Sequence, residues 1–379
     1  MLNINNMIKI IEVKTKKQQK QFINFPINLY KKNKYFVPPL YMDEKKMFKK
    51  NYMYYDQCEA VYYNAYIDNK IVGRISGIIQ YASNEKNNEK RVRFTRFDSI
   101  DNQDVANALF NKVENWAKSK GMDTIVGPLG FSDLEREGLL VEGFDELSTF
   151  EEQYNYDYYQ RLVENYGFEK EVDWVERKLY KPKEVDDRLE RVSSYMMKKN
   201  NLKFGTAKNK KEFLKKYADK FFDIIDETYY DIYGTVPFTK GMRDMMISNF
   251  KLIINMKQVA VIVDEDDNVV CFGICFSSIA KAVQKSKGHL TPLAIIRILK
   301  SIKNPEIIDC GLIGVLPKYA MRGISSALIS EIMKMLSEGN VKYAETNLNL
   351  ETNANIQNQW KSFDSIQHKR RRAYVKKID

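Results

Sequence analysis

The segment 309–329, which reads DCGLIGVLPKYAMRGISSALI, constrains the fold most, because an apolar strand passes through a proline-containing turn directly into an amphipathic helix. The first N–H groups of a helix have no partner within the helix, and the helix dipole adds partial positive charge there. Gly323 and the small side chains of Ser325 and Ser326 leave room for phosphate groups beside those N–H groups. The sequence therefore predicts an anion-binding turn here, with an ordinary strand-to-helix turn as the alternative.

The elements that the residue pattern predicts follow the same order in each half of the chain, which indicates two domains built alike. With 379 residues the chain exceeds the size of one compact core, so we expect domains at 1–181 and 182–379. The expected strands are 8–13, 60–67, 70–80, 91–98, 124–126, 168–179, 202–206, 258–263, 269–277, 307–315, 341–347 and 372–378. The expected helices are 16–30, 104–120, 152–166, 185–199, 211–230, 240–250, 292–303, 322–338 and 355–363. Segments 83–90 and 127–148 read as loops, and the whole predicts an α/β protein with mixed sheets.

The residues 320–325, which read AMRGIS, resemble the coenzyme-binding Gln/Arg-x-x-Gly-x-Gly/Ala loop of the GNAT acyltransferases. Gly323 matches that loop outright, Ser325 stands for its last small residue, and Ala320 departs from its first polar one. The order of strand, proline-containing turn, basic-glycine pair and apolar helix is also the order of that family. The resemblance extends over nearly the whole chain and points to a bacterial two-lobed GNAT family of unassigned substrates. It implies two tandem GNAT-like domains, each a mixed, mostly antiparallel sheet flanked by helices.

The same resemblance implies an acyl-CoA site in the C-terminal domain, with acetyl-CoA or another acyl-CoA as co-substrate. The residues that it assigns to coenzyme binding are Ile313, Gly314, Val315, Arg322, Gly323, Ile324, Ser325, Ser326 and Asn353. In the N-terminal domain, the corresponding helix start carries Asp98, Asp101 and Asp104 and no glycine. Carboxylates at a helix start repel a pyrophosphate, so we expect the N-terminal domain to be degenerate for coenzyme A.

Acyl transfer to an amine needs a group that takes the amine proton and stabilisation of the leaving thiolate. By its position relative to Arg322, Asp309 matches the strand glutamate that acts as the base in histone-type acetyltransferases, with Glu345 and Glu351 as rival bases. Trp360, which reads as a core residue, stands where the family commonly has a tyrosine that protonates the thiolate. The catalytic residues that we expect are Asp309, Glu345 and Tyr319, with Tyr343 or Tyr374 as alternative proton donors.

The formal charge of +11 comes from 61 basic and 50 acidic residues that are mostly dispersed. The tight basic run 368–372 reads as the solvated start of a strand, and without interleaved aromatic residues it does not favour nucleic acid. The two histidines, His289 and His368, have no acidic neighbour at ligand spacing, so we expect no metal site. Four scattered cysteines give no disulfide framework. Without a bilayer-spanning window or a signal peptide's apolar core, we expect a cytoplasmic protein with no membrane partner.

These features predict an N-acyltransferase that moves an acetyl or other acyl group from acyl-CoA to an unidentified small-molecule or peptide amine by direct attack. Two alternatives stay open. A non-catalytic module that binds coenzyme A or a protein partner accommodates the departures at Ala320 and Trp360. An aminoacyl-tRNA-dependent peptide-bridge transferase of related two-lobed architecture accounts for the basic charge through tRNA binding.

Overall fold

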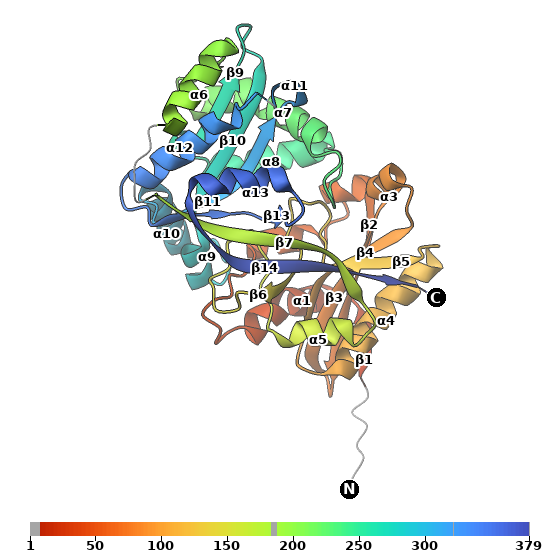
Figure 1. Cartoon of the computed structure of the whole chain (residues 1–379). Coiled ribbons are helices and arrows are strands. Elements are labelled where there is room, and N and C mark those ends of the chain that lie inside the picture. The colour runs from red at the N-terminus through yellow and green to blue at the C-terminus, as the bar shows by residue number, and fades with distance from the viewer. Residues whose placement is uncertain (1–7, 183–187, 321, 379) are drawn as a thin grey trace. The chain divides into compact units, whose positions relative to one another are not determined.

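The computed structural model describes residues 8–182, 188–320 and 322–378 and shows helices flanking strands of mixed direction, as the sequence predicts (Figure 1). Within the described residues the chain divides into two compact units. Unit 1 comprises Met1–Trp174, Ala280–Ile295 and Lys369–Asp379, and unit 2 comprises Val175–Ile279 and Ile296–His368. Strands β7 (Glu169–Tyr180) and β14 (Asp364–Lys377) therefore contribute residues to both units. The linear boundary expected after residue 181 stays a prediction.

Unit 1 is built on strands in the order β1-β2-β3-β4-β5-β14-β7, with β6 beside β14. The pairs β1–β2, β2–β3, β3–β4 and β5–β14 are antiparallel, and β4–β5 is parallel. Its remaining strands are β1 (Lys9–Glu12), β2 (Cys58–Ile67), β3 (Lys70–Gln80), β4 (Arg91–Ser99), β5 (Thr124–Gly127) and β6 (Leu139–Glu142). Its α-helices are α1 (Lys16–Leu29), α2 (Tyr41–Lys46), α3 (Tyr81–Asn87), α4 (Gln103–Ser119), α5 (Tyr158–Glu164) and α9 (Ala280–Lys285).

A hairpin turn and a helix cap in unit 1 have the structures that their residue types favour. Asp68 and Asn69 make the turn of the β2–β3 hairpin with φ angles of 48° and 62°. Two successive positive φ angles are typical of the hairpin turns that Asp and Asn tolerate. Helix α1 begins with a capping box, in which Thr15 and Gln18 each accept a hydrogen bond from the other's backbone N–H.

Unit 2 is built on strands in the order β7-β12-β11-β10-β9-β8, with β13 beside β7. The β11–β12 pair is parallel and the other pairs with a described register are antiparallel. Its other strands are β8 (Lys203–Phe204), β9 (Val259–Val263), β10 (Val269–Ser277), β11 (Ile307–Val315), β12 (Tyr343–Thr346) and β13 (Asn349–Leu350). Its helices are α6 (Arg188–Lys199), α7 (Lys210–Thr228), α8 (Lys240–Ile253), α11 (Pro317–Ala320), α12 (Ser325–Ser337) and α13 (Ala354–Gln359), while α10 (Pro292–Lys303) has residues in both units.

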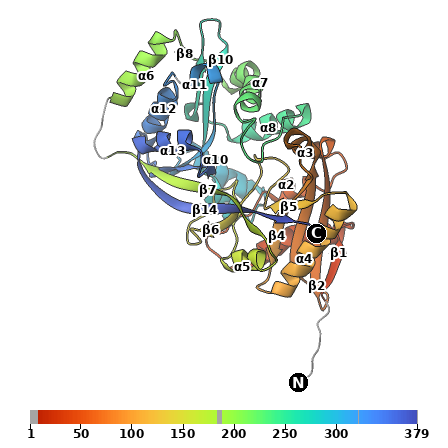
Figure 2. The same cartoon turned by 45° about the vertical axis from the view of Figure 1, so that its right-hand side comes forward.

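The helices of unit 2 cover its strands from two sides. Figure 2 shows α6 and α12 on one side of β10, with α7 and α8 on the other. Each side has its own apolar core: Phe221 of α7 stacks on Phe272 of β10, whereas Leu328 of α12 packs with Cys271 of the same strand. Neighbouring residues of β10 thus point to opposite faces, as strand geometry requires.

Several predicted elements differ in extent from the observed ones. Residues 83–90, expected as a loop, lie partly in α3, whose start is capped by the Gln80 side chain. The expected loop 127–148 contains β6, and only α5 forms within the expected helix 152–166. The expected helix 185–199 appears as α6, and its residues 185–187 lie outside the described residues. Strand β6 depends on its pairing with β14, a partner distant in sequence that local propensity does not include.

The prediction that the basic run near the C-terminus is a solvated strand start is wrong. Lys369 and Arg371 lie within β14 and are buried in unit 1, where both form ion pairs with buried Glu152, at 3.4 and 3.3 Å. Arg372, on the other face of the strand, donates to Asp173 at 2.8 Å. A buried charge needs an opposite charge close by, and the fold supplies one for each face of the strand. Lys369 and Arg371 therefore serve the core of unit 1.

Candidate functional site

Strand β11 pairs with β10 as far as its last residue, but its pairing with β12 ends earlier. Its pairing with β10 extends to Val315, the last residue of β11. Its parallel pairing with β12 covers four positions and ends at Cys310 opposite Thr346. The residues 311–315 thus extend beyond the paired stretch of β12, where a ligand can add main-chain hydrogen bonds to a strand. This segment contains the residues predicted to hold the pantetheine arm.

The hydroxyl group of Tyr229 lies at this part of β11. Tyr229 follows the last turn of α7, and its hydroxyl donates to the carbonyl oxygen of Ile313 at 2.8 Å. The N–H of Ile313 lies 3.4 Å from the same hydroxyl oxygen, at the outer limit of a hydrogen bond. The hydroxyl therefore bridges both main-chain groups of Ile313. Sequence reasoning missed Tyr229, because a tyrosine at the end of a helix carries no motif.

The turn between β11 and α12 is built around Gly323. Helix α12 begins at Ser325, slightly later than the expected start at Arg322. Gly323 has a φ angle of 68°, in the left-handed region that glycine adopts without steric cost. The Ser326 hydroxyl donates to the Gly323 carbonyl oxygen at 2.6 Å and so holds the turn against the first turn of the helix.

The start of α12 has the features of an anion site. Its N-cap residue is Ile324, whose side chain makes no capping hydrogen bond, whereas Asn102 caps α4 in unit 1 through the N–H of Val105. Arg322 lies at the turn, where it donates to Asn200 at 3.1 Å. A positive side chain beside an uncapped helix start opposes the helix dipole, and a bound anion would offset both charges.

Gly311 and Gly314 have a packing role on β11. A Cβ atom at Gly314 would lie 2.6 Å from Phe272 Cε1 and 2.7 Å from Ile224 Cγ2. A Cβ atom at Gly311 would lie 2.6 Å from Phe276 Cε2. The missing side chains thus allow the aromatic rings of β10 to lie over β11. Packing against β10 explains Gly314 without a ligand, so its predicted contact with coenzyme A stays a prediction.

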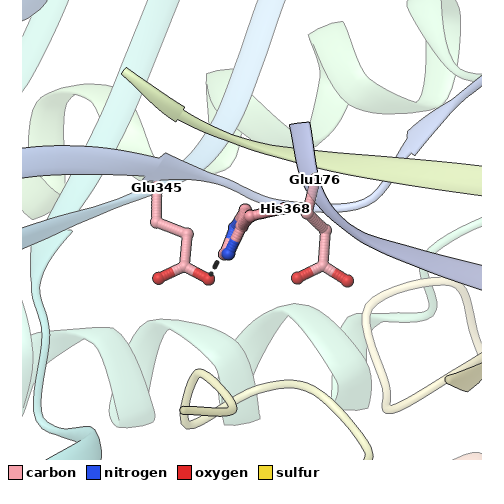
Figure 3. Close-up of side chains that lie close together, drawn as sticks. All are labelled: Glu176, Glu345 and His368. Atoms are coloured by element: carbon pink, nitrogen blue, oxygen red, sulfur yellow. Dashed lines mark ion pairs between the residues drawn. The ribbon is translucent and has the colours of Figure 1, made fainter. Parts of the chain in front are cut away.

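Three buried ionisable side chains meet on neighbouring strands of unit 2 (Figure 3). Glu176 belongs to β7, Glu345 to β12 and His368 to β14, strands that lie side by side in the sheet. His368 Nε2 lies 3.2 Å from Glu345 Oε1, and these two side chains are 4% and 5% exposed. Figure 3 shows the imidazole between the two carboxylates. One ligand atom of each residue lies within 4.8 Å of the others. One nitrogen and two oxygen donors in this arrangement can share a proton or hold a divalent cation.

Asp309 lies beside this cluster in the sheet. It pairs with Glu345 across β11 and β12, so the two side chains share a face. Asp309 also pairs with Phe276 of β10, and the Phe276 ring stacks on Phe250 of α8 with centroids 5.4 Å apart. The face that carries both predicted bases is therefore the one covered by α8. The fold brings Glu176 and His368 close to Glu345, which lies beside Asp309.

Sequence reasoning missed Glu176 and His368 as site residues. They are far apart in the sequence and become neighbours because β14 lies next to β7. Neither Glu176 nor Glu345 is near His368 in the sequence, whereas the fold brings both carboxylates to it. The burial of Glu176 within β7 is the signal for such a site, since a glutamate at a core position of a strand needs a partner.

Two residues predicted near the coenzyme have structural partners. Trp360 is 4% exposed and its Nε1–H donates to Asn349 Oδ1 at 2.8 Å, which confirms the prediction of a core residue. Asn353 is the N-cap of α13, and its side-chain oxygen accepts from the N–H of Ile356 at 3.3 Å. A coenzyme contact of Asn353 stays a prediction.

The tyrosines expected to protonate the thiolate have other surroundings. Tyr319 on α11 is buried in the apolar cluster that includes Leu328 of α12. Tyr343 is the first residue of β12, at the end opposite to Thr346. Tyr374 belongs to unit 1, where its hydroxyl donates to Glu164 at 3.2 Å. The tyrosine hydroxyl that contacts the main chain of Ile313 belongs instead to Tyr229.

Asp98, one of the acidic residues near the start of α4 in unit 1, takes part in a buried polar network. Asp98 accepts from Arg74 Nε at 2.7 Å and from the Tyr30 hydroxyl at 3.1 Å. Burial raises the pKa of Asp98 above its ordinary value, although Arg74 acts in the opposite direction. The prediction that this unit is degenerate for coenzyme A is compatible with a helix start that Asn102 already caps.

Sequence similarity to two known proteins covers most of the chain. No protein-family model matches it. The chain is 25% identical over 380 residues to Protein YghO of Escherichia coli K12, covering 96% of this chain and 94% of that protein. It is 26% identical over 306 residues to a bacterial ceramide synthase of Caulobacter vibrioides, covering 79% of this chain and 77% of that protein.

Solved structures similar to this one include two with acetyltransferase architecture. A tandem GNAT protein from the clavulanic acid biosynthesis pathway matches with a TM-score of 0.55 at 9% identity, over 98% of this chain and 99% of that chain. The GCN5-related glucosamine N-acetyltransferase region of a fungal multi-domain GH3 β-N-acetylglucosaminidase matches with a TM-score of 0.58 at 12% identity, over 98% of this chain and 38% of that chain. At these identities the likeness concerns the fold.

Proposed function

We propose, from the premise that this chain has the tandem GNAT fold, that unit 2 transfers an acyl group from an acyl-CoA thioester to an amine. The observation that carries the proposal is the register of β11. Asp309 lies beside Glu345 in the stretch paired with β12, and Ile313 lies in the stretch beyond it. One strand thus offers a proton acceptor and, a few residues later, a main-chain edge for the thioester arm.

Acyl-CoA would bind along β11 and at the start of α12. The pantetheine amides would use the main-chain groups of residues 311–315, and the pyrophosphate would accept from the first N–H groups of α12. Gly323 keeps the turn free of a side chain, and Arg322 adds a positive charge. The place of Ser325 and Ser326 in the first turn of the helix supports their proposed contact with the coenzyme.

The reaction needs a proton acceptor at the amine. The amine nitrogen attacks the thioester carbonyl carbon, a C–N bond forms, the C–S bond breaks, and the thiolate leaves. Asp309 would accept the amine proton, and the Glu345–His368 pair beside it can take up the proton in turn. The thiolate finally takes up a proton, so charge and atoms balance. Glu176, whose carboxylate lies near the same imidazole, would be the third group of this network.

For the acceptor we propose a long-chain amine. One relative is named a bacterial ceramide synthase, and a ceramide is an amide of a long-chain amino alcohol. A small cavity beside β11 has an apolar lining, which is compatible with contact to part of a hydrocarbon chain. The lining residues are Leu214, Ala218, Phe221, Phe222, Ile225, Ile247, Phe250, Ile254, Ile274 and Leu312.

The test is an acylation assay on the full chain with acetyl-CoA or palmitoyl-CoA as donor and sphinganine or a short alkylamine as acceptor. Mass spectrometry detects the amide, and a thiol reagent follows coenzyme A release. We expect an amide of sphinganine, and a rate about a hundredfold or more lower in Asp309→Asn. Asp244→Asn, at an exposed position of α8, is the matched control and should leave the rate unchanged.

The outcomes separate the parts of the proposal. Product from short amines alone would contradict the long-chain acceptor and leave acyl transfer standing. Binding of acyl-CoA without product from any amine would favour the non-catalytic alternative. A chain that binds no acyl-CoA would contradict the proposed function altogether.

A further inference from the structure

Helix α10 is apolar around most of its circumference. Its sequence PLAIIRILKSIK has eight apolar residues among twelve, and Ala294 faces the protein interior. A surface helix normally hides its apolar stripe and shows a polar face to water. On α10 the outward positions are largely apolar instead, with exposed fractions of 54% for Leu293, 45% for Ile295, 62% for Ile296 and 56% for Leu299.

The exposed apolar side chains of α10 form one face. Ile296 lies three residues from both Leu293 and Leu299, a spacing that places side chains side by side on a helix. Lys300 and Lys303, both exposed, each follow an exposed apolar residue by four positions on the same face. The outward face of α10 thus combines leucine and isoleucine with lysine.

The segment around α10 is also strongly basic. Residues 280–304 contain six basic residues and no acidic residue. The six are Lys281, Lys285, Lys287, Arg297, Lys300 and Lys303. A protein partner that covers such a face would need acidic groups within an apolar surface, whereas an anionic bilayer offers both at its headgroup boundary.

We propose that α10 docks this protein on the surface of an anionic lipid bilayer. Twelve residues rise about 18 Å, which is less than the roughly 30 Å of a bilayer's hydrocarbon core. In the described part of the chain, no helix has the length and apolar character for crossing a membrane. The helix therefore lies in the interface, with Ile296 and Leu299 among the acyl chains and Lys300 and Lys303 at the phosphates. This docking is independent of the chemistry proposed for unit 2.

Flotation of the full chain with vesicles tests the proposal. Vesicles of phosphatidylcholine with 30% phosphatidylglycerol are compared with vesicles of phosphatidylcholine alone. We expect the chain to float with the anionic vesicles, and the double variant Ile296→Glu, Leu299→Glu to bind about tenfold or more weakly. A second variant, Lys300→Gln with Lys303→Gln, should keep residual binding and lose most of the preference for phosphatidylglycerol.

The control is Tyr195→Glu on α6, another helix of unit 2, where a large side chain is 60% exposed. It should bind vesicles as the unchanged chain does, and circular dichroism checks that each variant is folded. A chain that does not float, or variants of α10 that float as well as the control, would overturn the proposal. Sedimentation velocity adds one further reading: a dimer that Ile296→Glu dissociates, without vesicle binding, would assign the face to a second copy of the chain instead.

Discussion

Replacing Tyr229 with phenylalanine removes one hydroxyl group from β11 and keeps the aromatic ring. The hydroxyl donates to the Ile313 carbonyl oxygen at 2.8 Å, and the Ile313 N–H approaches it at 3.4 Å. A hydrogen bond of normal length contributes about 1 kcal/mol net to stability, and the longer contact adds little. We therefore expect the free energy of unfolding of Tyr229→Phe to fall by about 1 kcal/mol.

The same substitution should strengthen the binding of acyl-CoA. If the pantetheine arm uses the main-chain groups of Ile313, it must displace the Tyr229 hydroxyl from them. The phenylalanine variant has no such hydrogen bond to break. A gain of about 1 kcal/mol corresponds to a dissociation constant about fivefold lower. Stability and affinity should thus change in opposite directions.

Calorimetric titration with acetyl-CoA measures the affinity, and denaturant unfolding measures the stability. The matched control is Tyr230→Phe, because Tyr230 is the next residue and is 54% exposed. Weaker binding of acetyl-CoA by Tyr229→Phe would refute the reasoning, since the hydroxyl would then be a contact of the coenzyme rather than a group in its place. Equal affinity in both variants and the unchanged chain would place the coenzyme away from Ile313.

Three further predictions concern packing and titration. Gly314→Ala places a Cβ atom 2.6 Å from Phe272 Cε1, so denaturant unfolding should show a loss of about 1–3 kcal/mol. Burial raises the pKa of Asp173, yet hydrogen bonds, above all from Arg372, lower it overall to about 2. A carboxyl group whose pKa is lowered by folding stabilises the fold at pH values above its unfolded pKa. The free energy of unfolding should therefore fall by about 2 kcal/mol between pH 4 and pH 2, and Asp173→Asn should not show that fall. Burial raises the pKa of the Cys58 thiol to about 12, so at pH 8 mass spectrometry should find it labelled by a thiol reagent only after unfolding.

The sequence specified elements whose signals lie within a few residues. Strand β11 spans Ile307–Val315, the range that its apolar pattern predicts. The Asp68–Asn69 turn also follows from residue type, because few other residues adopt positive φ angles easily. Gly323, expected in the first turn of a helix, lies instead in the turn before α12. These local preferences, placed in the same order twice, were sufficient to predict the tandem α/β architecture.

The site depended on contacts that no local pattern contains. Asp309 and Glu345 could be chosen from their strands, but His368 joins Glu176 and Glu345 only because β14 lies beside β7. Tyr229 reaches Ile313 from the end of a helix on another layer. Each of these contacts brings together residues that are far apart along the chain.

The sequence by itself thus determined the type and order of the elements, and tertiary structure decided which side chains are buried together. The basic residues of β14 show the difference: their composition indicates solvent, yet Arg371 is buried against Glu152. The apolar residues of α10 show the reverse, since isoleucine is usually buried in folded proteins and Ile296 is exposed. The physical reason is that backbone preferences act between near neighbours, whereas burial and ion pairing depend on strand order and helix placement across the whole chain.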